Sequence, residues 1–373
     1  MGELDEVLAA LEASRAERAR PVALATIISA RGSTYRREGA RLVVPEEGEP
    51  VGNISGGCLE GDVVQTARQV LATGQPQVLT FDLTADDEAV WGWGLGCNGV
   101  IEVLVEPADL ASRCAAALRL ARQEQRPVAL VTVVEGEHLG LRMVVRPDAT
   151  TEGGLGEDAL DQSALDSSLD ALAAGQSGTA SLGPGQVRTF IEVLEPPVHL
   201  IVCGAGHDAI PLVDFGARLG WRVDVVDDRS AFLTQERFPA AQRLVTAPPR
   251  RAAEATAADQ RSHVVVMSHN FRRDQDYLRS FLDSPAPYLG MLGPRARLER
   301  ILHELASDGE PVKPDARHRL YGPAGLDIGA EGPEEIAWAI VAEILAVRRH
   351  APGGKLNERS GPIHRQTAIA VTR

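Results

Sequence analysis

The segment ISGGCLE at 54–60 holds the residues best suited to chemistry in this chain. Cys58 follows two glycines and precedes apolar residues at helical spacing, so we expect it at the start of a helix. The amides and dipole at such a position stabilise a thiolate, and the amides of Gly56 and Gly57 could bind an anion. Glu60 could handle a proton or serve as a helix-terminus charge. In the alternative interpretation, Cys58 fills a core and the glycines only form a turn.

A second glycine-rich segment, WGWGLGCNG at 91–99, contains Gly96 and Cys97. Its composition suits close approach of the backbone to a ligand and suits no regular element. Two glycine–cysteine segments in one part of the chain favour a shared site. The four cysteines of the chain form no CxxC pair, which excludes a ferredoxin-type iron–sulfur pattern and a zinc ribbon.

An arginine cluster precedes the first of these segments. The stretch ARGSTYRREGAR at 30–41 contains four arginines and one glutamate in an otherwise acidic protein. Such a cluster, including Arg36, could fix a phosphate or pyrophosphate by bidentate contacts. A solvated loop whose arginines pair with surface acids is equally compatible with the pattern.

A third candidate is GAGHDA at 204–209, which matches G-x-G-x-x-A between an apolar strand and a helix. Gly204 permits the tight turn, Gly206 lets a phosphate approach the backbone, and Asp227, at the end of the next strand, can accept from a ribose hydroxyl. The pattern predicts binding of a dinucleotide or related nucleotide. The alternative is a sheet that keeps its glycine turn only for helix packing.

Two histidines accompany this motif. His207 occupies the mouth of the turn, where it could polarise a ligand or cap the helix. His269, in MSHN at a strand end, could be functional or a satisfied terminus. Arg229 leaves the choice between NAD and NADP open, because an arginine after the acid can bind a phosphate.

The elements that must position these residues begin with a degenerate repeat. Four segments recur: RPVALAT (20–26) as RPVALVT (126–132), RLVV (41–44) as RMVV (142–145), VLATGQP (70–76) as ALAAGQS (171–177), and IEVLVEP (101–107) as IEVLEPP (191–197). Residues 1–195 are therefore predicted to be two copies of one α/β unit, about 1–107 and 108–195. Each copy is predicted to contain strands and a helix that ends at Gly74 or Gly175.

The copies differ where the chemistry is expected. The second copy lacks 11 residues where the first has WGWGLGCNG, and it has EGGLGEDAL (152–160) in place of GNISGGCLE (52–60). A copy that keeps the strands and loses both cysteines is predicted to be a packing partner. The first copy is then the functional one.

From 198 to 348 strands alternate with helices, which predicts a parallel sheet with right-handed crossovers. We expect strands at 199–206, 222–228, 263–269 and 287–293, and helices at 208–220 and at about 273–283, 294–306 and 333–348. Residues 349–373 have no periodicity and are predicted to be a flexible tail. The predicted fold is thus α/β, a duplicated amino-terminal domain followed by a carboxy-terminal Rossmann-like parallel-sheet domain.

The composition limits the partners. The 373 residues include 38 Lys and Arg against 52 Asp and Glu, for a formal net charge of −14, which argues against a nucleic-acid partner. The chain has no long apolar run, and its first residues are charged rather than signal-like. We expect a cytoplasmic protein that binds no membrane.

Taken together, these segments resemble the XdhC/CoxI family, the accessory factors of xanthine dehydrogenase and related molybdenum hydroxylases. The similarity lies in GSTYRREGARLVV, GNISGGCLEGDVV, WGLGCNGVIEVLVEP, CGAGHDAIPL, VVDDR, VVMSHN, YLGMLGPRAR and GPAGLDIGAEGPEEIAWAIVAEIL. It covers nearly the whole chain. Asn98, Asp208 and Ala209 depart from the usual residues of the family.

The resemblance implies an assembly factor that binds molybdenum cofactor, a molybdopterin, and protects it while its terminal sulfur is installed. The factor then delivers it to a hydroxylase of the xanthine dehydrogenase type, working with a cysteine desulfurase. On this hypothesis Arg36 and the amides of Gly56 and Gly57 hold the pterin phosphate. Cys58, and with it Cys97, faces the molybdenum, for which a soft thiolate is suited.

The resemblance also implies a cofactor chaperone rather than a stand-alone enzyme, with a homodimer as the expected assembly. Its Rossmann-like half would bind NAD(P), another nucleotide or the nucleotide form of the cofactor. Two hypotheses compete with this one. An NAD(P)-dependent oxidoreductase would use His207 or His269 as acid–base and would show hydride transfer, whereas a docking scaffold would carry neither metal nor pterin.

Overall fold

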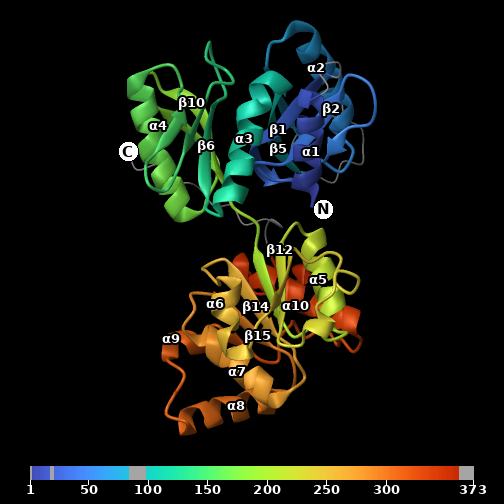
Figure 1. Cartoon of the computed structure of the whole chain (residues 1–373). Coiled ribbons are helices and arrows are strands. Elements are labelled where there is room, and N and C mark those ends of the chain that lie inside the picture. Colours follow the sequence, from blue (N-terminus) through green and yellow to red (C-terminus); the bar gives the residue numbers. More distant parts are fainter. Residues whose placement is uncertain (1, 17–20, 84–97, 361–373) are drawn as a thin grey trace. The chain divides into compact units, whose positions relative to one another are not determined.

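The computed structural model describes residues 2–16, 21–83 and 98–360 (Figure 1). These residues form two compact units, the first from Glu3 to Pro196 and the second from Pro197 to Glu358. The first contains two antiparallel sheets and the second one parallel sheet. The predicted fold class, a duplicated α/β part followed by a Rossmann-like part, is confirmed.

The first copy is a five-stranded antiparallel sheet in the order β3-β2-β1-β5-β4. Its strands are β1 (Val22–Ser33), β2 (Arg41–Pro45), β3 (Val51–Gly52), β4 (Gln77–Asp82) and β5 (Asn98–Pro107). Helix α2 (Glu60–Thr73) covers one face, because Val63, Ala67 and Val70 recur at helical spacing and pack on the apolar residues of β1 and β5. The helix ends at Gly74, as predicted.

The second copy repeats this sheet in the order β8-β7-β6-β10-β9. Its strands are β6 (Val128–Val133), β7 (Arg142–Val145), β8 (Thr151–Gly153), β9 (Gly178–Leu182) and β10 (Val187–Leu194). Helix α4 (Asp158–Ala174) covers one face and ends at Gly175. Helix α1 (Glu3–Ala16) packs on β2, β3 and helix α3 (Ala108–Glu124), and α3 packs against strands of both sheets, which joins the copies.

The strand pairing corrects the sequence alignment of the copies by one residue. Leu42 pairs with Gly52 in the first copy, and Met143 pairs with Gly153 in the second. The offset is therefore 101 throughout this region, so 52–60 corresponds to 153–161 and not to 152–160. Backbone pairing fixes this register, whereas glycine-rich sequences align equally well one residue apart. Ala159 is then the counterpart of Cys58.

Buried ion pairs connect the copies reciprocally. Arg142 Nη1 lies 2.7 Å from Glu106 Oε2, and the two side chains are 3% and 0% exposed. Arg41 of the first copy forms the opposite pair with Glu192 of the second. Arg41 Nη2 also donates to Cys114 Sγ at 3.4 Å, and burial raises the pKa of that thiol. The two copies are therefore one folded structure.

The second unit is a six-stranded parallel sheet in the order β13-β12-β11-β14-β15-β16. Its strands are β11 (His199–Cys203), β12 (Arg222–Asp227), β13 (Arg243–Thr246), β14 (Ser262–Val266), β15 (Tyr288–Met291) and β16 (Leu320–Tyr321). Its helices include α5 (Ala209–Arg218), α6 (Ala252–Thr256), α7 (Phe271–Leu282), α8 (Arg295–Ser307), α9 (Pro314–Arg317) and α10 (Pro333–Arg348). The predicted strands and helices are present, and β13, β16, α6 and α9 were not predicted.

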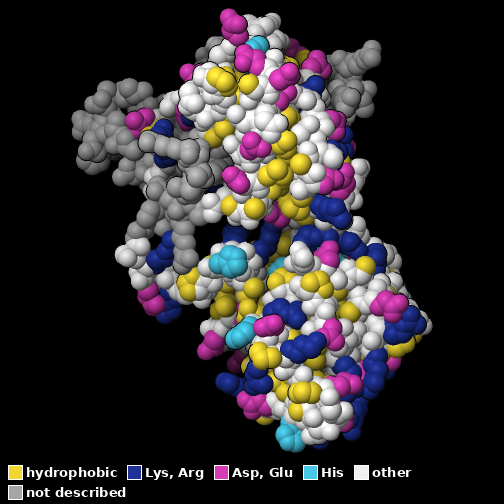
Figure 2. All heavy atoms as spheres, turned by 90° about the vertical axis from the view of Figure 1, so that its left-hand side faces the viewer, with side chains coloured by type: hydrophobic (Ala, Val, Ile, Leu, Met, Phe, Trp, Pro, Cys, Tyr) yellow, Lys and Arg dark blue, Asp and Glu magenta, His cyan; other side chains and the backbone are white. Residues whose placement is uncertain are grey.

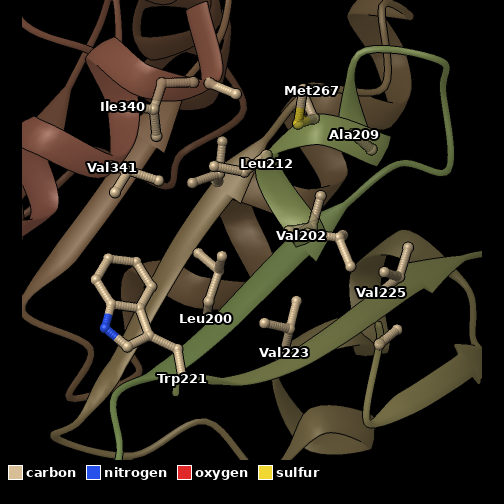
Figure 3. Close-up of a cluster of buried hydrophobic side chains, with 14 of the residues drawn as sticks. Leu200, Val202, Ala209, Leu212, Trp221, Val223, Val225, Met267, Ile340 and Val341 are labelled. Carbon is tan, nitrogen blue, oxygen red and sulfur yellow. The ribbon is translucent and has the colours of Figure 1, made fainter. Parts of the chain in front are cut away.

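Helices cover both faces of this sheet because its central strands are apolar on both sides. Leu200 and Val202 of β11 face α5 and α10, where they meet Leu212 and Ile340 (Figure 3). The alternate residue Ile201 packs with α7 and α8 on the other face. The chain reverses its winding direction between β11 and β14, and in such folds ligands bind at the carboxyl ends of the strands at that point.

None of the helices in the described ranges has the length and apolar character needed to cross a membrane. On the face shown in Figure 2, acidic and basic side chains are interspersed on both units. The predicted tail, 349–373, lies partly outside the described residues. Its flexibility stays a prediction.

Candidate functional site

The loops that carry the candidate residues of the first copy leave its sheet at one end. Thr26 pairs with Arg41, and Ser33 pairs with Asn98. The loop 34–40, the turn 53–59 after β3, and the connection from β4 to β5 therefore begin or end at this end of the sheet. The structure thus brings the loop of Arg36 and the Gly56–Cys58 turn to the same end of the sheet. Gly96 and Cys97 lie outside the described residues, and their roles stay predictions.

The Gly56–Cys58 turn is open to solvent on its glycine side. A Cβ placed on Gly56 or Gly57 meets no atom of the described residues within 4 Å, and Gly57 has a φ of +104°, which favours glycine. Helix α2 begins at Glu60, two residues beyond Cys58, so Cys58 precedes the helix. Its thiol is free, half-buried and packed against the first-copy core.

Glu60 and Ser55 hold this turn in place. The Glu60 carboxylate accepts hydrogen bonds from the Ser55 amide at 2.9 Å, from the Ser55 hydroxyl, and from the Leu59 amide at 3.2 Å. The Gly57 amide donates to Ser55 Oγ at 3.1 Å. Partial burial acts to raise the pKa of Glu60, but these hydrogen bonds outweigh it and lower the pKa from its ordinary value of 4.5. The carboxylate serves as a cap, and its predicted proton-handling role is untested.

The second copy keeps the cap and lacks the thiol. Asp161, the counterpart of Glu60, accepts from the Leu155 amide at 2.7 Å. Ala159 replaces Cys58, and α4 begins at Asp158, three residues earlier than α2 by the 101-residue offset. Residues that extend the helix in one copy are therefore an exposed turn in the other. The cap belongs to the shared fold, whereas the glycines and the thiol are specific to the first copy.

Arg36 is paired within the chain. Its Nη2 donates to both carboxylate oxygens of Glu3, at 2.9 and 3.0 Å, and both side chains are partly exposed. It lines a pocket of about 280 Å³ between the copies. The charged residues of that pocket are Arg36, Arg41, Arg122, Glu3, Glu38, Glu192 and Glu195. A phosphate there must compete with Glu3 for Arg36.

The glycine turn of the second unit has the geometry that its sequence predicts. Gly204 has a φ of +113°, and a Cβ on it would lie 2.7 Å from the Ser268 Cα, so the turn approaches the end of β14 as only glycine allows. Within the described part of the chain, a Cβ on Gly206 would meet nothing closer than the His269 ring at 3.8 Å. This side of the turn has room for a ligand.

Both oxygens of the Asp227 carboxylate accept hydrogen bonds within the chain. Its Oδ2 accepts from the Ala205 amide and from Arg229 Nη2, each at 2.8 Å. Its Oδ1 accepts from the Arg229 amide and from Arg229 Nε, each at 2.9 Å. Burial acts to raise the pKa of Asp227, but these hydrogen bonds hold it well below its usual range. In this conformation Asp227 anchors the turn and Arg229, and its predicted ribose contact stays a prediction.

The two predicted histidines lie in the loops that follow the carboxyl ends of β11 and β14 in the parallel sheet. His207 is exposed at the mouth of the turn. His269 Nε2 lies 2.8 Å from Asp208 Oδ2, and His269 has a φ of +56°, an uncommon conformation for a non-glycine residue that is enriched at functional sites. From the sequence, Asp208 stands out only as a departure from a family pattern. Its position next to His207 was the available signal.

Comparison with known proteins covers both units. The model of the XdhC and CoxI family matches residues 15–82 and 121–183, and the model of the XdhC Rossmann domain matches residues 200–344. A protein of Bacillus subtilis (strain 168) named as a probable xanthine dehydrogenase subunit is 32% identical over 328 residues, 87% of this chain and 93% of that protein.

Two further relatives agree with these matches. The molybdenum cofactor insertion chaperone PaoD of Escherichia coli (strain K12) is 23% identical, over 88% of this chain and 83% of its own length. The crystal structure of a protein described as a xanthine dehydrogenase from Bacillus halodurans is 29% identical, with a TM-score of 0.75 over 94% of this chain and 96% of that one. The similarity extends over both units.

Proposed function

Because this chain belongs to the XdhC and CoxI family, we propose that it is a maturation factor that binds molybdenum cofactor and delivers it, after sulfuration, to a hydroxylase of the xanthine dehydrogenase type. The name of the PaoD relative supports the cofactor as cargo. The observation that carries the proposal is the exposed Gly-Gly-Cys turn. It replaces a helical turn in only one of two copies that share a strand order.

The chemistry of the turn fits such a cargo. Cys58 supplies a soft sulfur ligand beside open space, which suits molybdenum or its sulfur ligands. The amides of Gly56 and Cys58 have no acceptor among the residues described, so both can donate to an anionic oxygen. Arg36, on a loop at the same end of the sheet, would exchange Glu3 for the pterin phosphate. Gly96 and Cys97 complete the proposed set.

The second unit is proposed to bind NAD(P), another nucleotide or the nucleotide form of the cofactor at its glycine turn. The open side of Gly206 and the position of the turn where the winding reverses support this. We also propose that Glu60 acts at the Gly56–Cys58 turn and that His207 and His269 contact the ligand at the glycine turn. We further propose a cytoplasmic homodimer that works with a cysteine desulfurase.

The decisive experiment measures bound cofactor. The full chain, purified from a host that makes molybdenum cofactor, should contain molybdenum by mass spectrometry and pterin by fluorescence after oxidation. Cys58→Ala should lose both while remaining folded by circular dichroism. The matched control, Cys58→Ala with Ala159→Cys, puts a thiol at the equivalent position of the second copy and should not restore binding. Cofactor retention by folded Cys58→Ala would reject the site.

Delivery needs its own assay. The loaded protein should activate a hydroxylase apoenzyme, and a cysteine desulfurase with cysteine should increase the activity obtained. Activation that is independent of the desulfurase would reject the sulfuration step alone. Light scattering of the purified chain tests the homodimer.

A further inference from the structure

The saturated carboxylate of Asp227 bears on which nucleotide the second unit can select. A carboxylate has about four lone-pair sites, and Asp227 uses all four on the Ala205 amide and on Arg229. In dinucleotide-binding folds the acid at this position accepts from the ribose 2′-hydroxyl. Here a free ribose diol would have to displace Arg229 from a buried carboxylate that is 1% exposed.

Asp227 holds the Arg229 guanidinium, which still has unused N–H donors. Its Nε and one Nη2 hydrogen are used on Asp227, and its other three N–H groups have no acceptor within the described part of the chain. The side chain remains 31% exposed. The pairing with Asp227 fixes the plane of the guanidinium, and a fixed guanidinium with free donors is suited to phosphate.

A second arginine lies beside it. The Phe232 ring, 40% exposed, has the Arg229 Cζ 4.5 Å and the Arg237 Cζ 5.5 Å from its centroid. Arg237 Nη2 donates to the Ala205 carbonyl of the glycine turn at 3.2 Å, and its buried Nε has no partner among the described residues. Two guanidinium groups therefore flank one exposed ring next to the turn.

The nearby acids are already paired with other groups of the chain. Asp228 lies 3.2 Å from Arg273, and Asp208 pairs with His269 on the other side of the turn. Asp227 is itself committed to Arg229. Among the described residues Arg237 has no ion-pair partner, and Arg229 keeps donors that Asp227 does not use.

We infer that the nucleotide site selects a ligand with a phosphate group on its ribose, of the NADP type, over one with a free diol, and that Arg229 determines this choice. The inference rests on the nucleotide binding proposed above. Asp227 is a positioning residue that holds Arg229 and the turn. Removal of Arg229 frees acceptor sites on Asp227 and should move the preference toward the diol.

Calorimetric titration of the full chain with NADP⁺ and with NAD⁺ tests this inference. NADP⁺ should bind at least about tenfold more tightly, a difference of about 1.4 kcal/mol. Arg229→Gln should lose that advantage and bind NAD⁺ as well as or better than the native chain does. Arg300→Gln is the matched control, because Arg300 also lies over a phenylalanine ring, Phe271, and pairs with a surface glutamate. It should change neither affinity.

The outcomes separate the two proposals. Equal affinities in the native chain, or an equal loss of both in Arg229→Gln, would overturn the selectivity and leave the nucleotide site standing. Failure of either nucleotide to bind would overturn the site and the inference together. Asp227→Asn should lower the ratio of the two affinities, a readout that loss of turn stability alone does not change. If Arg229→Gln does not fold, Arg229→Lys is the milder variant, and it should give a ratio of NADP⁺ to NAD⁺ affinity between those of the native chain and a chain without selectivity.

Discussion

The first and second copies of the amino-terminal unit have sheets with the same strand order and helices on the same face, but two of their connections at one end of the sheet differ. Fifteen residues connect β4 to β5 in the first copy, whereas four connect β9 to β10 in the second. The 11 residues that the second copy lacks all belong to this connection. The sheet therefore folds without them.

The turn before the helix differs between the copies in the same way. Both copies keep a buried leucine, Leu59 or Leu160, and a capping carboxylate, Glu60 or Asp161. Only the first gives up a turn of helix to expose Gly-Gly-Cys. What both copies retain belongs to the shared fold, and what one copy alone has is the better guide to function.

The largest effect is expected where the two copies meet. Arg142→Met should lower the free energy of unfolding by about 3–5 kcal/mol, because it leaves the Glu106 carboxylate buried without its partner. Urea unfolding followed by circular dichroism measures the change. The double variant Arg142→Met with Glu106→Leu should recover most of the loss. A small effect of the single variant would mean that the copies are not coupled through this pair.

The next effect tests the shared cap. Glu60→Ala and Asp161→Ala should each cost about 1 kcal/mol at neutral pH, because each removes the acceptor of one backbone amide, that of Ser55 or that of Leu155. The pKa of Glu60 is lowered on folding, so its contribution is present above its ordinary pKa of 4.5 and is lost as the pH falls through the folded value. The Glu60→Ala deficit should therefore shrink in acid. A deficit independent of pH would contradict the charged cap.

Much of the fold could be predicted from local sequence patterns, but only part of the candidate site could. The repeated strands and the glycine turn were predictable because period and turn chemistry are local properties. The partners of Arg142 and Asp227 were not, because they depend on side-chain geometry that spacing does not encode. The one-residue alignment error has the same origin, since Gly153 finds its place by pairing with Met143. Short edge strands such as β3 have too few residues for a detectable period.

The smallest expected effect is the sharpest test of the comparison. Cys58→Ala should change the free energy of unfolding by less than about 0.5 kcal/mol, because its side chain is only half-buried and the second copy folds with Ala159 at this position. Cys114→Ala is the contrast, since that sulfur is buried and accepts from Arg41, and its loss should cost measurably more. Thermal unfolding of the two variants side by side measures both. If Cys58→Ala is as destabilising as Cys114→Ala, the thiol is a core residue, and the difference between the copies is one of packing.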